Sequence, residues 1–247
     1  APSTTSYHQS GHYYPVTVEA ENTAGTKTTV NDQTPDIGDS LKLYVKERVK
    51  PTITITSPGA GAYVTNSKQP IVFQLRDEAG GSGIDISSLV LKIDGGASIG
   101  HGSSGMVCTP VTNGYDCTYT PPSALSEGPH TVTIDVSDND GNAADQASRT
   151  YTVDTIPPVL NLTHPEDGFI TNNASMVVQG TTNDATSTPV TITITLNSVD
   201  QGPVTVTSGA FSKTVTLAEG DNTIVVTATD AAGKTTTVTI EGVLDTS

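Results

Sequence analysis

The stretch VTIDVSDNDG at residues 132–141 has two counterparts, VTVEAENTAG at residues 16–25 and IVVTATDAAG at residues 224–233. In each, apolar and polar residues largely alternate and a four-residue turn then ends in glycine, which is typical of a strand that leads into a hairpin. A Thr-rich stretch follows every turn, as expected for the returning strand. The chain therefore predicts a series of similar β modules, and such arrays usually provide reach and binding surfaces rather than catalysis.

The composition of the 247-residue chain favours an all-β protein with thin cores. Apolar residues make up 34% of the chain and aromatic residues 4%, without any Trp, while 23 Gly and 15 Pro fall between short alternating runs. Cores of Val, Ile and Leu with Thr on the outside suit two-layered β-sandwiches. A disordered chain would lack these β-branched alternations.

The charge balance limits the partners. The chain has 26 acidic and 11 basic residues, a net charge of −15, which argues against nucleic acid and against anionic lipid surfaces. No apolar run approaches the ~20 residues that span a bilayer, so we expect no membrane insertion. Solubility and mutual repulsion of an exposed protein explain the acidity; Ca²⁺ binding where modules meet is the alternative.

Two segments share an opening that marks the first strand of a module: KPTITITSPGAGAYVTN at residues 50–66 and PPVLNLTHPEDGFITN at residues 157–172. In both, a proline fixes the start, alternation makes the strand, and a second proline and a glycine turn the chain. We predict modules at residues 50–154 and 155–247. About seven strands can be read in the first of them, the number expected for an immunoglobulin-like sandwich, with a long loop and a helical turn at residues 77–88.

Residues 1–49 lack the first strands of a module and are too few for a β core of their own. They carry the final hairpin of the repeat and a further strand around residues 41–47. We interpret them as the C-terminal part of a preceding immunoglobulin-like module or a β extension, and the chain as a fragment of a longer polypeptide.

Residues 158–245 resemble bacterial immunoglobulin-like domains of the glucodextranase domain B type, and residues 51–154 are similar to a related bacterial repeat. The motifs that carry the resemblance are HPEDG at residues 164–168, LAEGDN at 217–222, TDAAGK at 229–234, GSGID at 81–85 and LKIDG at 91–95. The resemblance implies tandem immunoglobulin-like β-sandwiches. It also implies a setting in secreted surface proteins, in polysaccharide-degrading enzymes, or on phage and phage-tail-like particles, where such modules are spacers and weak adhesion modules. These motifs are turns and strand ends, so they say little about a ligand.

Cys108 and Cys117 are the only cysteines. If residues 111–114 form a four-residue hairpin loop with Gly114 in the left-handed conformation, the two cysteines face each other on neighbouring strands. A disulfide is then geometrically reasonable and implies an oxidising compartment. The alternative is two free thiols in a particle assembled in the cytosol.

Two places offer carboxylates for Ca²⁺. The first is DNDGN at residues 138–142, where Asp138 and Asp140 lie close together. The spacing is not that of an EF-hand, because the sixth and twelfth positions are not the required Gly and Glu, and the other two copies of the turn lack the second carboxylate. A turn role for Asp and Gly therefore explains all three copies. The second candidate is a junction site that combines Asp154 with Glu166 or Asp167.

Sugar contact is predicted at Tyr115, at the tip of the Cys108/Cys117 hairpin, because sugars are commonly held by exposed aromatic side chains. Packing in the core or the hairpin is the alternative for Tyr115, and for Phe169 it is the expected role. His8 and His12 lie among tyrosines in YHQSGHYY at residues 7–14. Without a paired carboxylate or cysteine their spacing is a weak metal-ligand pattern, and a strand edge is expected there.

No nucleophile motif stands beside any remaining histidine, so we expect no enzyme within these residues. We predict a non-catalytic spacer and adhesion fragment of an extracellular protein, displayed on a cell surface or a virion. Its expected partners are cell-surface polysaccharide or protein and further modules of the same polypeptide, bound by weak contacts multiplied along an array. The alternative is an accessory carbohydrate-binding region of a secreted polysaccharide-active enzyme.

Overall fold

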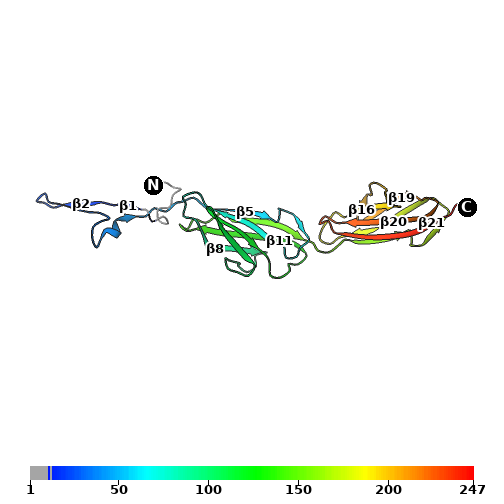
Figure 1. Cartoon of the computed structure of the whole chain (residues 1–247), viewed down its shortest axis with the longest axis horizontal. Coiled ribbons are helices and arrows are strands. Elements are labelled where there is room, and N and C mark those ends of the chain that lie inside the picture. The colour runs from blue at the N-terminus through cyan, green and yellow to red at the C-terminus, as the bar shows by residue number, and fades with distance from the viewer. Residues whose placement is uncertain (1–10, 12) are drawn as a thin grey trace. The chain divides into compact units, whose positions relative to one another are not determined.

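The computed structural model describes residue 11 and residues 13–247 and is all-β, with no α-helix in the described part (Figure 1). These residues form two compact units. The first comprises the described residues up to 60 together with 70–123 and 130–150; the second comprises 61–69, 124–129 and 151–247. Within the described residues, no helix has the length and apolar character that crossing a bilayer requires.

The first sandwich packs two four-stranded sheets, in the strand orders β5-β7-β10-β9 and β6-β12-β11-β8. Its strands are β5 (Thr52–Ser57), β6 (Tyr63–Val64), β7 (Ile71–Arg76), β8 (Ile84–Ile93), β9 (Met106–Val111), β10 (Gly114–Tyr119), β11 (Gly128–Asp138) and β12 (Ala147–Val153). In β7 every second side chain is buried, so that Ile71, Phe73 and Leu75 meet Leu91 and Ile134 of the facing sheet in one core. This period of two is what a strand with one buried face requires.

The loop expected at residues 77–88 is shorter than predicted. Strand β8 begins at Ile84, which is buried and pairs with Asp138 of β11. The pairing register of β8 with β11 shifts between Asp135 and Ser137. The alternation of Ile84 and Ile86 is thus strand sequence and not a helical turn. The glycines and serine before it had suggested a longer irregular segment.

The turn between β9 and β10 has the predicted position but a different conformation. Val111 pairs with Gly114, and the left-handed residue is Asn113 (φ 58°) rather than Gly114. Gly114 is needed for another reason: a Cβ there would lie 1.9 Å from the carbonyl oxygen of Leu75 on the neighbouring strand. Close approach of the two backbones, together with the positive φ of 156° at Gly114, therefore requires glycine at this position.

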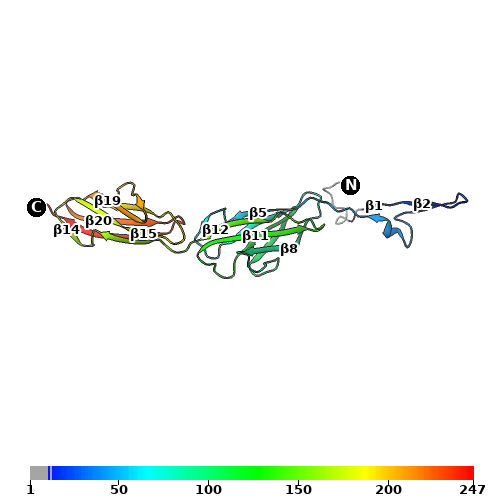
Figure 2. The same cartoon turned by 180° about the vertical axis from the view of Figure 1, so that it is seen from behind.

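The second sandwich packs sheets in the orders β13-β15-β19-β18 and β14-β21-β20-β16-β17 (Figure 2). Its strands are β13 (Val159–His164), β14 (Phe169–Thr171), β15 (Ser175–Asn183), β16 (Thr191–Leu196), β17 (Val199–Asp200), β18 (Val206–Thr207), β19 (Ala210–Thr216), β20 (Gly220–Thr229) and β21 (Thr235–Leu244). The core contains Val178, Ile194, Phe211, Ile224 and Val226. It is a separate cluster from the core of the first sandwich.

In both sandwiches the first segment of the chain contributes to both sheets. In the second, β13 pairs antiparallel with β15, and after a turn β14 pairs parallel with β21. In the first, β5 pairs with β7, while β6 pairs parallel with the end of β12. The Phe169 ring of β14 lies against Gly242, where a Cβ would come within 2.3 Å of it, so Phe169 has the packing role expected for it.

The described residues before β5 form two small sheets. Strands β2 (Val18–Glu21) and β3 (Lys27–Val30) make the predicted hairpin, and β1 (Tyr14–Pro15) pairs with β4 (Lys42–Leu43) after a 3₁₀ turn, η1 (Gly38–Leu41). The strand expected at residues 41–47 is therefore only two residues long. All residues of β1 and β2 are exposed, so this segment supplies no core. His8 and His12 lie outside the described residues.

Candidate functional site

The repeated turn at the end of VTIDVSDNDG and its two counterparts has the same hydrogen bonds in all three copies. In the first sandwich the Gly141 amide donates to the Asp138 carbonyl, and Asp138 Oδ1 accepts the amide of Asn142 (2.8 Å). In the second, Gly233 donates to the Asp230 carbonyl and Asp230 Oδ1 accepts the Lys234 amide (2.8 Å). The turn role predicted for these aspartates is present in both sandwiches.

Both aspartates are also close to other buried acids: Asp138 lies beside one acidic cluster, and Asp230 belongs to another. In the first unit, Glu47, Asp77 and Glu78 each place one carboxylate oxygen within 4.8 Å of the others. Glu47 lies in the segment that precedes β5, and the other two residues directly follow β7. The cluster therefore connects the segment before the first strand with the end of β7. Glu47 and Asp77 are buried, with exposures of 1% and 7%.

Asp138 and Asp140 adjoin this cluster through Glu47. The Glu47 amide donates to Asp140 Oδ2 (2.9 Å), and Ser82 Oγ, which receives the Asp140 amide, donates to Glu47 Oε1 (3.2 Å). Burial, and after it the hydrogen bond with Asp138, raises the pKa of Glu47 to about 7. Burial likewise raises the pKa of Glu78, with a further contribution from the neighbouring Asp77 carboxylate. These shifts arise because several acids share one poorly hydrated place.

The second cluster has the same design. Asp154, which follows β12, and Asp184 and Asp230 each place one carboxylate oxygen within 4.8 Å of the others, all inside the second unit. Asp154 is fully buried: its Oδ1 accepts the Ile156 amide (3.2 Å), and its Oδ2 accepts a short hydrogen bond from Ser187 Oγ. Asp184 Oδ1 accepts the amides of Thr186 and Ser187.

The two clusters occupy equivalent positions in the sequence. Glu47 stands four residues before Pro51 and Asp154 four residues before Pro158; Asp77 and Asp184 each stand 26 residues after the same prolines. The third member comes from the repeated turn, as Asp138 beside the first cluster and as Asp230 in the second. These acids lie far apart in the sequence and form no contiguous metal-binding motif; their equivalence is seen only when the two modules are aligned on these prolines.

The predicted junction pair is not what the structure brings together. Asp154 meets Asp184 and Asp230, whereas Asp167 receives the Glu241 amide at its Oδ1 (2.9 Å) in the turn after β13. Glu166 lies in that same turn. The reason is geometric: a strand of six residues separates Asp154 from this turn, and a strand rises ~3.3 Å per residue, so the turn lies at the far end of β13.

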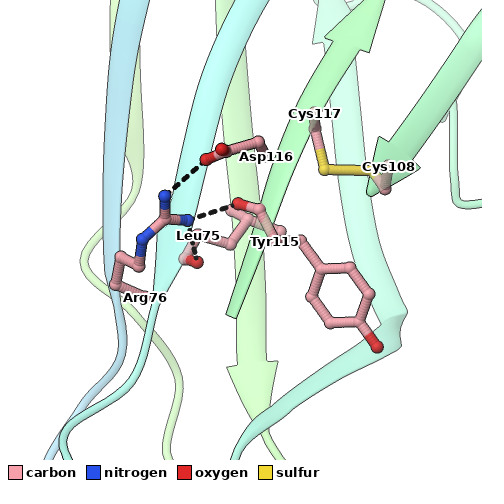
Figure 3. Close-up of a disulfide and its surroundings, with 6 residues drawn as sticks. All are labelled: Leu75, Arg76, Cys108, Tyr115, Asp116 and Cys117. Carbon is pink, nitrogen blue, oxygen red and sulfur yellow. Dashed lines mark hydrogen bonds and ion pairs between the residues drawn. A yellow bond between two sulfur atoms is a disulfide. The ribbon is translucent and has the colours of Figure 1, made fainter. Parts of the chain in front are cut away.

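The predicted disulfide positions face each other. Cys108 of β9 pairs with Cys117 of β10, with a Cα–Cα distance of 4.1 Å and bonded sulfur atoms (Figure 3). Tyr115 is not at the hairpin tip: it pairs with Leu75 and Pro110, and its side chain packs in part against the first core. Figure 3 shows its ring extending away from Arg76, which donates to the carbonyl of Tyr115 (2.6 Å).

The architecture defines a class, that of tandem immunoglobulin-like β-sandwich modules. Comparison with known families is consistent along most of the chain: residues 51–134 match the family described as bacterial Ig domain, and residues 158–245 match glucodextranase, domain B. The chain thus carries two consecutive bacterial immunoglobulin-like domains, the second of the glucodextranase domain B type.

A curated relative is Bacillopeptidase F of Bacillus subtilis (strain 168), which is 33% identical over 113 residues. The match takes in 46% of this chain but only 7% of that protein. Among solved structures, the fibronectin(III)-like modules of Clostridium thermocellum CbhA are similar over 78% of this chain and 94% of theirs, at 16% identity and a TM-score of 0.44. An I-band fragment of titin is similar over 79% of this chain and 66% of its own, at 13% identity and a TM-score of 0.49.

Proposed function

We propose that these modules are a non-catalytic spacer and weak adhesion region of an extracellular bacterial or virion-displayed protein. The observation that carries the proposal is the fold itself, two consecutive sandwiches with separate cores. Each sandwich presents long strands whose outward side chains are largely Thr and other small polar residues. Such surfaces suit many weak contacts with a polymer, and the repetition of modules multiplies their strength.

A disulfide between Cys108 and Cys117 supports the extracellular setting, because such bonds persist in oxidising compartments. The net charge of −15 favours solubility and disfavours polyanionic partners. Bacterial immunoglobulin-like domains are common in extracellular proteins, which points in the same direction.

The second candidate is an accessory region of a secreted enzyme, with carbohydrate contact as its role. It is favoured by the match of residues 158–245 to a domain named for glucodextranase. On the second sandwich, an open groove of about 560 Å³ is lined in part by His164, Glu166, Asp167 and Phe169, a mixture of polar and aromatic side chains that could hold a sugar.

The test is binding of the labelled, purified chain to intact bacterial cells and to a panel of their polysaccharides, with Ca²⁺ and with a chelator. Saturable binding supports adhesion, and a polysaccharide-selective signal favours the accessory role. Tyr115→Leu is compared with Tyr63→Leu, which changes another tyrosine of the same sandwich, and thermal unfolding checks that both remain folded. Absence of binding to every cell and polymer in both conditions would remove adhesion and leave the spacer role alone.

A further inference from the structure

We propose that each sandwich binds one Ca²⁺ ion at its acidic cluster: the first through Glu47, Asp77 and Glu78 with Asp138 beside them, and the second through Asp154, Asp184 and Asp230. Each site combines residues from three places: the segment before the first strand (β5 or β13), the residues that follow β7 or β15, and the repeated turn. The proposal does not depend on what the modules adhere to.

The first support is the set of buried carboxylate oxygens that have no hydrogen-bond partner. In the described part of the chain these include Asp77 Oδ1 and both oxygens of Glu78 in the first cluster, and Asp230 Oδ2 in the second. Asp77 and Asp230 are more than nine-tenths buried, with exposures of 7% and 5%. A buried ionised group without a partner is costly, and a cation held between the carboxylates would remove that cost.

The second support is that, in the described residues, the negative charge of the clusters is not compensated by salt bridges with basic side chains. Among the described residues, no salt bridge to Lys, Arg or His involves Glu47, Asp77 or Glu78, and the same is true of Asp154, Asp184 and Asp230. Lys46, which neighbours Glu47 in sequence, donates from Nζ to the Asp140 carbonyl (3.1 Å). Three acids of each cluster therefore face one another, a charge arrangement that a divalent ion compensates.

The donor set selects the kind of ion. Every candidate ligand is a carboxylate oxygen, and no His or Cys joins either cluster. Zn²⁺ and Cu²⁺ favour imidazole and thiolate, whereas Ca²⁺ accepts carboxylates, carbonyls and water in flexible geometry. Gly81 lies against the first cluster, where a Cβ would come within 2.7 Å of Asp77 Oδ2 and 2.9 Å of Glu78 Oε1. Glycine there leaves the carboxylates room on that side.

The third support is the recurrence of the arrangement. Two modules that differ at most positions keep an acid four residues before the first-strand proline, an acid 26 residues after it, and an aspartate that opens the repeated turn. The remaining copy of the turn has Asn22 in place of the aspartate, and its Oδ1 accepts the Thr26 amide (2.9 Å) as in the other copies. The turn alone thus requires only an Asn or Asp, while the two described sandwiches both have the charged residue.

The experiment is a calcium titration of the full chain by isothermal titration calorimetry, after treatment with chelator. We expect two bound ions per chain, with dissociation constants of about 0.1–1 mM, as for extracellular modules. Asp77→Asn should reduce the stoichiometry to one by emptying the first site, and Asp184→Asn should do so by emptying the second. The double variant should bind none, and Asp221→Asn, which makes the same change at an exposed position of β20, should still bind two.

Thermal unfolding distinguishes a cation site from hydrogen-bonded structural acids. Calcium should raise the melting temperature of the wild-type chain. In chelator, Asp77→Asn and Asp184→Asn should be at least as stable as the wild-type chain, because they remove repulsion between buried acids. Three results would overturn the proposal: no saturable binding at 5 mM Ca²⁺, unchanged stoichiometry in the double variant, or variants that lose equal stability with and without calcium.

Discussion

Asp138 and Asp230 each contribute to two structures, a turn and an acidic cluster. One carboxylate oxygen accepts a backbone amide of the turn, and the side chain also lies beside acids from segments far away in the chain. The local part follows from sequence, because Asp-x-x-Gly is a turn signal whose partners lie within four residues. The contact with the acidic clusters depends on the positions of Glu47 and Asp184 in the folded sandwich, and no contiguous sequence motif predicts those positions.

The Asp94–His130 pair gives a prediction about pH. His130 Nδ1 lies 2.6 Å from Asp94 Oδ2, and the Thr131 amide donates to Asp94 Oδ1 (2.7 Å). Burial raises the pKa of Asp94, but these hydrogen bonds outweigh it and the pKa lies below its usual value. A carboxyl with a depressed pKa in the folded state stabilises the fold above its unfolded pKa of ~3.9 and loses that effect as the pH falls through the folded value.

We therefore expect the melting temperature of the wild-type chain to fall more steeply between pH 5 and pH 3 than that of Asp94→Asn. Because Asp94 is half exposed, the difference should be small. Asp85→Asn, near the start of β8 and away from His130, serves as the control. Parallel pH profiles for Asp94→Asn and the wild-type chain would contradict the assignment.

Gly242 gives a prediction about packing. A Cβ at this position would lie 2.3 Å from the Phe169 ring, so Gly242→Ala should destabilise the second sandwich by about 1–3 kcal/mol, the usual cost of overpacking. Chemical denaturation measures the change. The double variant with Phe169→Leu should recover part of the loss, and a double-mutant cycle with no coupling would show that the contact does not exist.

Strands and hairpins were predictable to different extents. The long alternating runs of β7, β11 and β20 follow from their own side chains, because one buried face imposes a period of two. The start of β8 and the two- and three-residue strands β14 and β17 do not, since they are strands only through the neighbours with which they pair. The acidic clusters were likewise not predictable, because they form only through contacts between residues far apart in the sequence.

The β9–β10 hairpin gives a prediction about the disulfide. Cys108 and Cys117 close a loop with a sequence separation of 9, and loop-closure entropy then suggests a stabilisation of about 2–3 kcal/mol. Replacing both residues with alanine should lower the stability of the first sandwich by this amount and leave the second unchanged. Reductant should reproduce the effect in the wild-type chain, and equal stability of the oxidised and reduced protein would count against it.

The segment before β5 gives a prediction about proteolysis, which rests on the proposed Ca²⁺ site. Lys46 and Arg48 are exposed on either side of the buried Glu47. If calcium fixes Glu47 to the first sandwich, trypsin should cleave after Lys46 or Arg48 more slowly in calcium than in chelator. Glu47→Gln should remove the difference, whereas an equal cleavage rate in both conditions with wild-type protein would contradict it.

For the chain as a whole, the fold class was predictable from the sequence. The repeated turn and the two proline-marked openings indicated tandem immunoglobulin-like sandwiches, and the family matches at residues 51–134 and 158–245 agree. The motifs that carry the family resemblance do not identify a polymer or protein that the modules would bind, because those motifs form turns and strand ends.

The separate cores give a prediction about independent folding. Since each sandwich buries its own apolar cluster, residues 154–247, which retain the buried Asp154, should unfold cooperatively with the melting temperature of the second sandwich in the full chain. Differential scanning calorimetry of both proteins measures this. A large drop in the isolated segment would show that its stability depends on the preceding residues.

The parallel pairing of β14 with β21 has a mechanical consequence. Phe169, Ile170 and Thr171 pair with Gly242, Val243 and Leu244. Tension applied to the two ends of this sandwich pulls β14 toward its own N-terminal end and β21 toward its own C-terminal end. Because the strands run the same way, the load shears their hydrogen bonds together instead of opening them one after another, so the sandwich resists extension until the whole ladder ruptures.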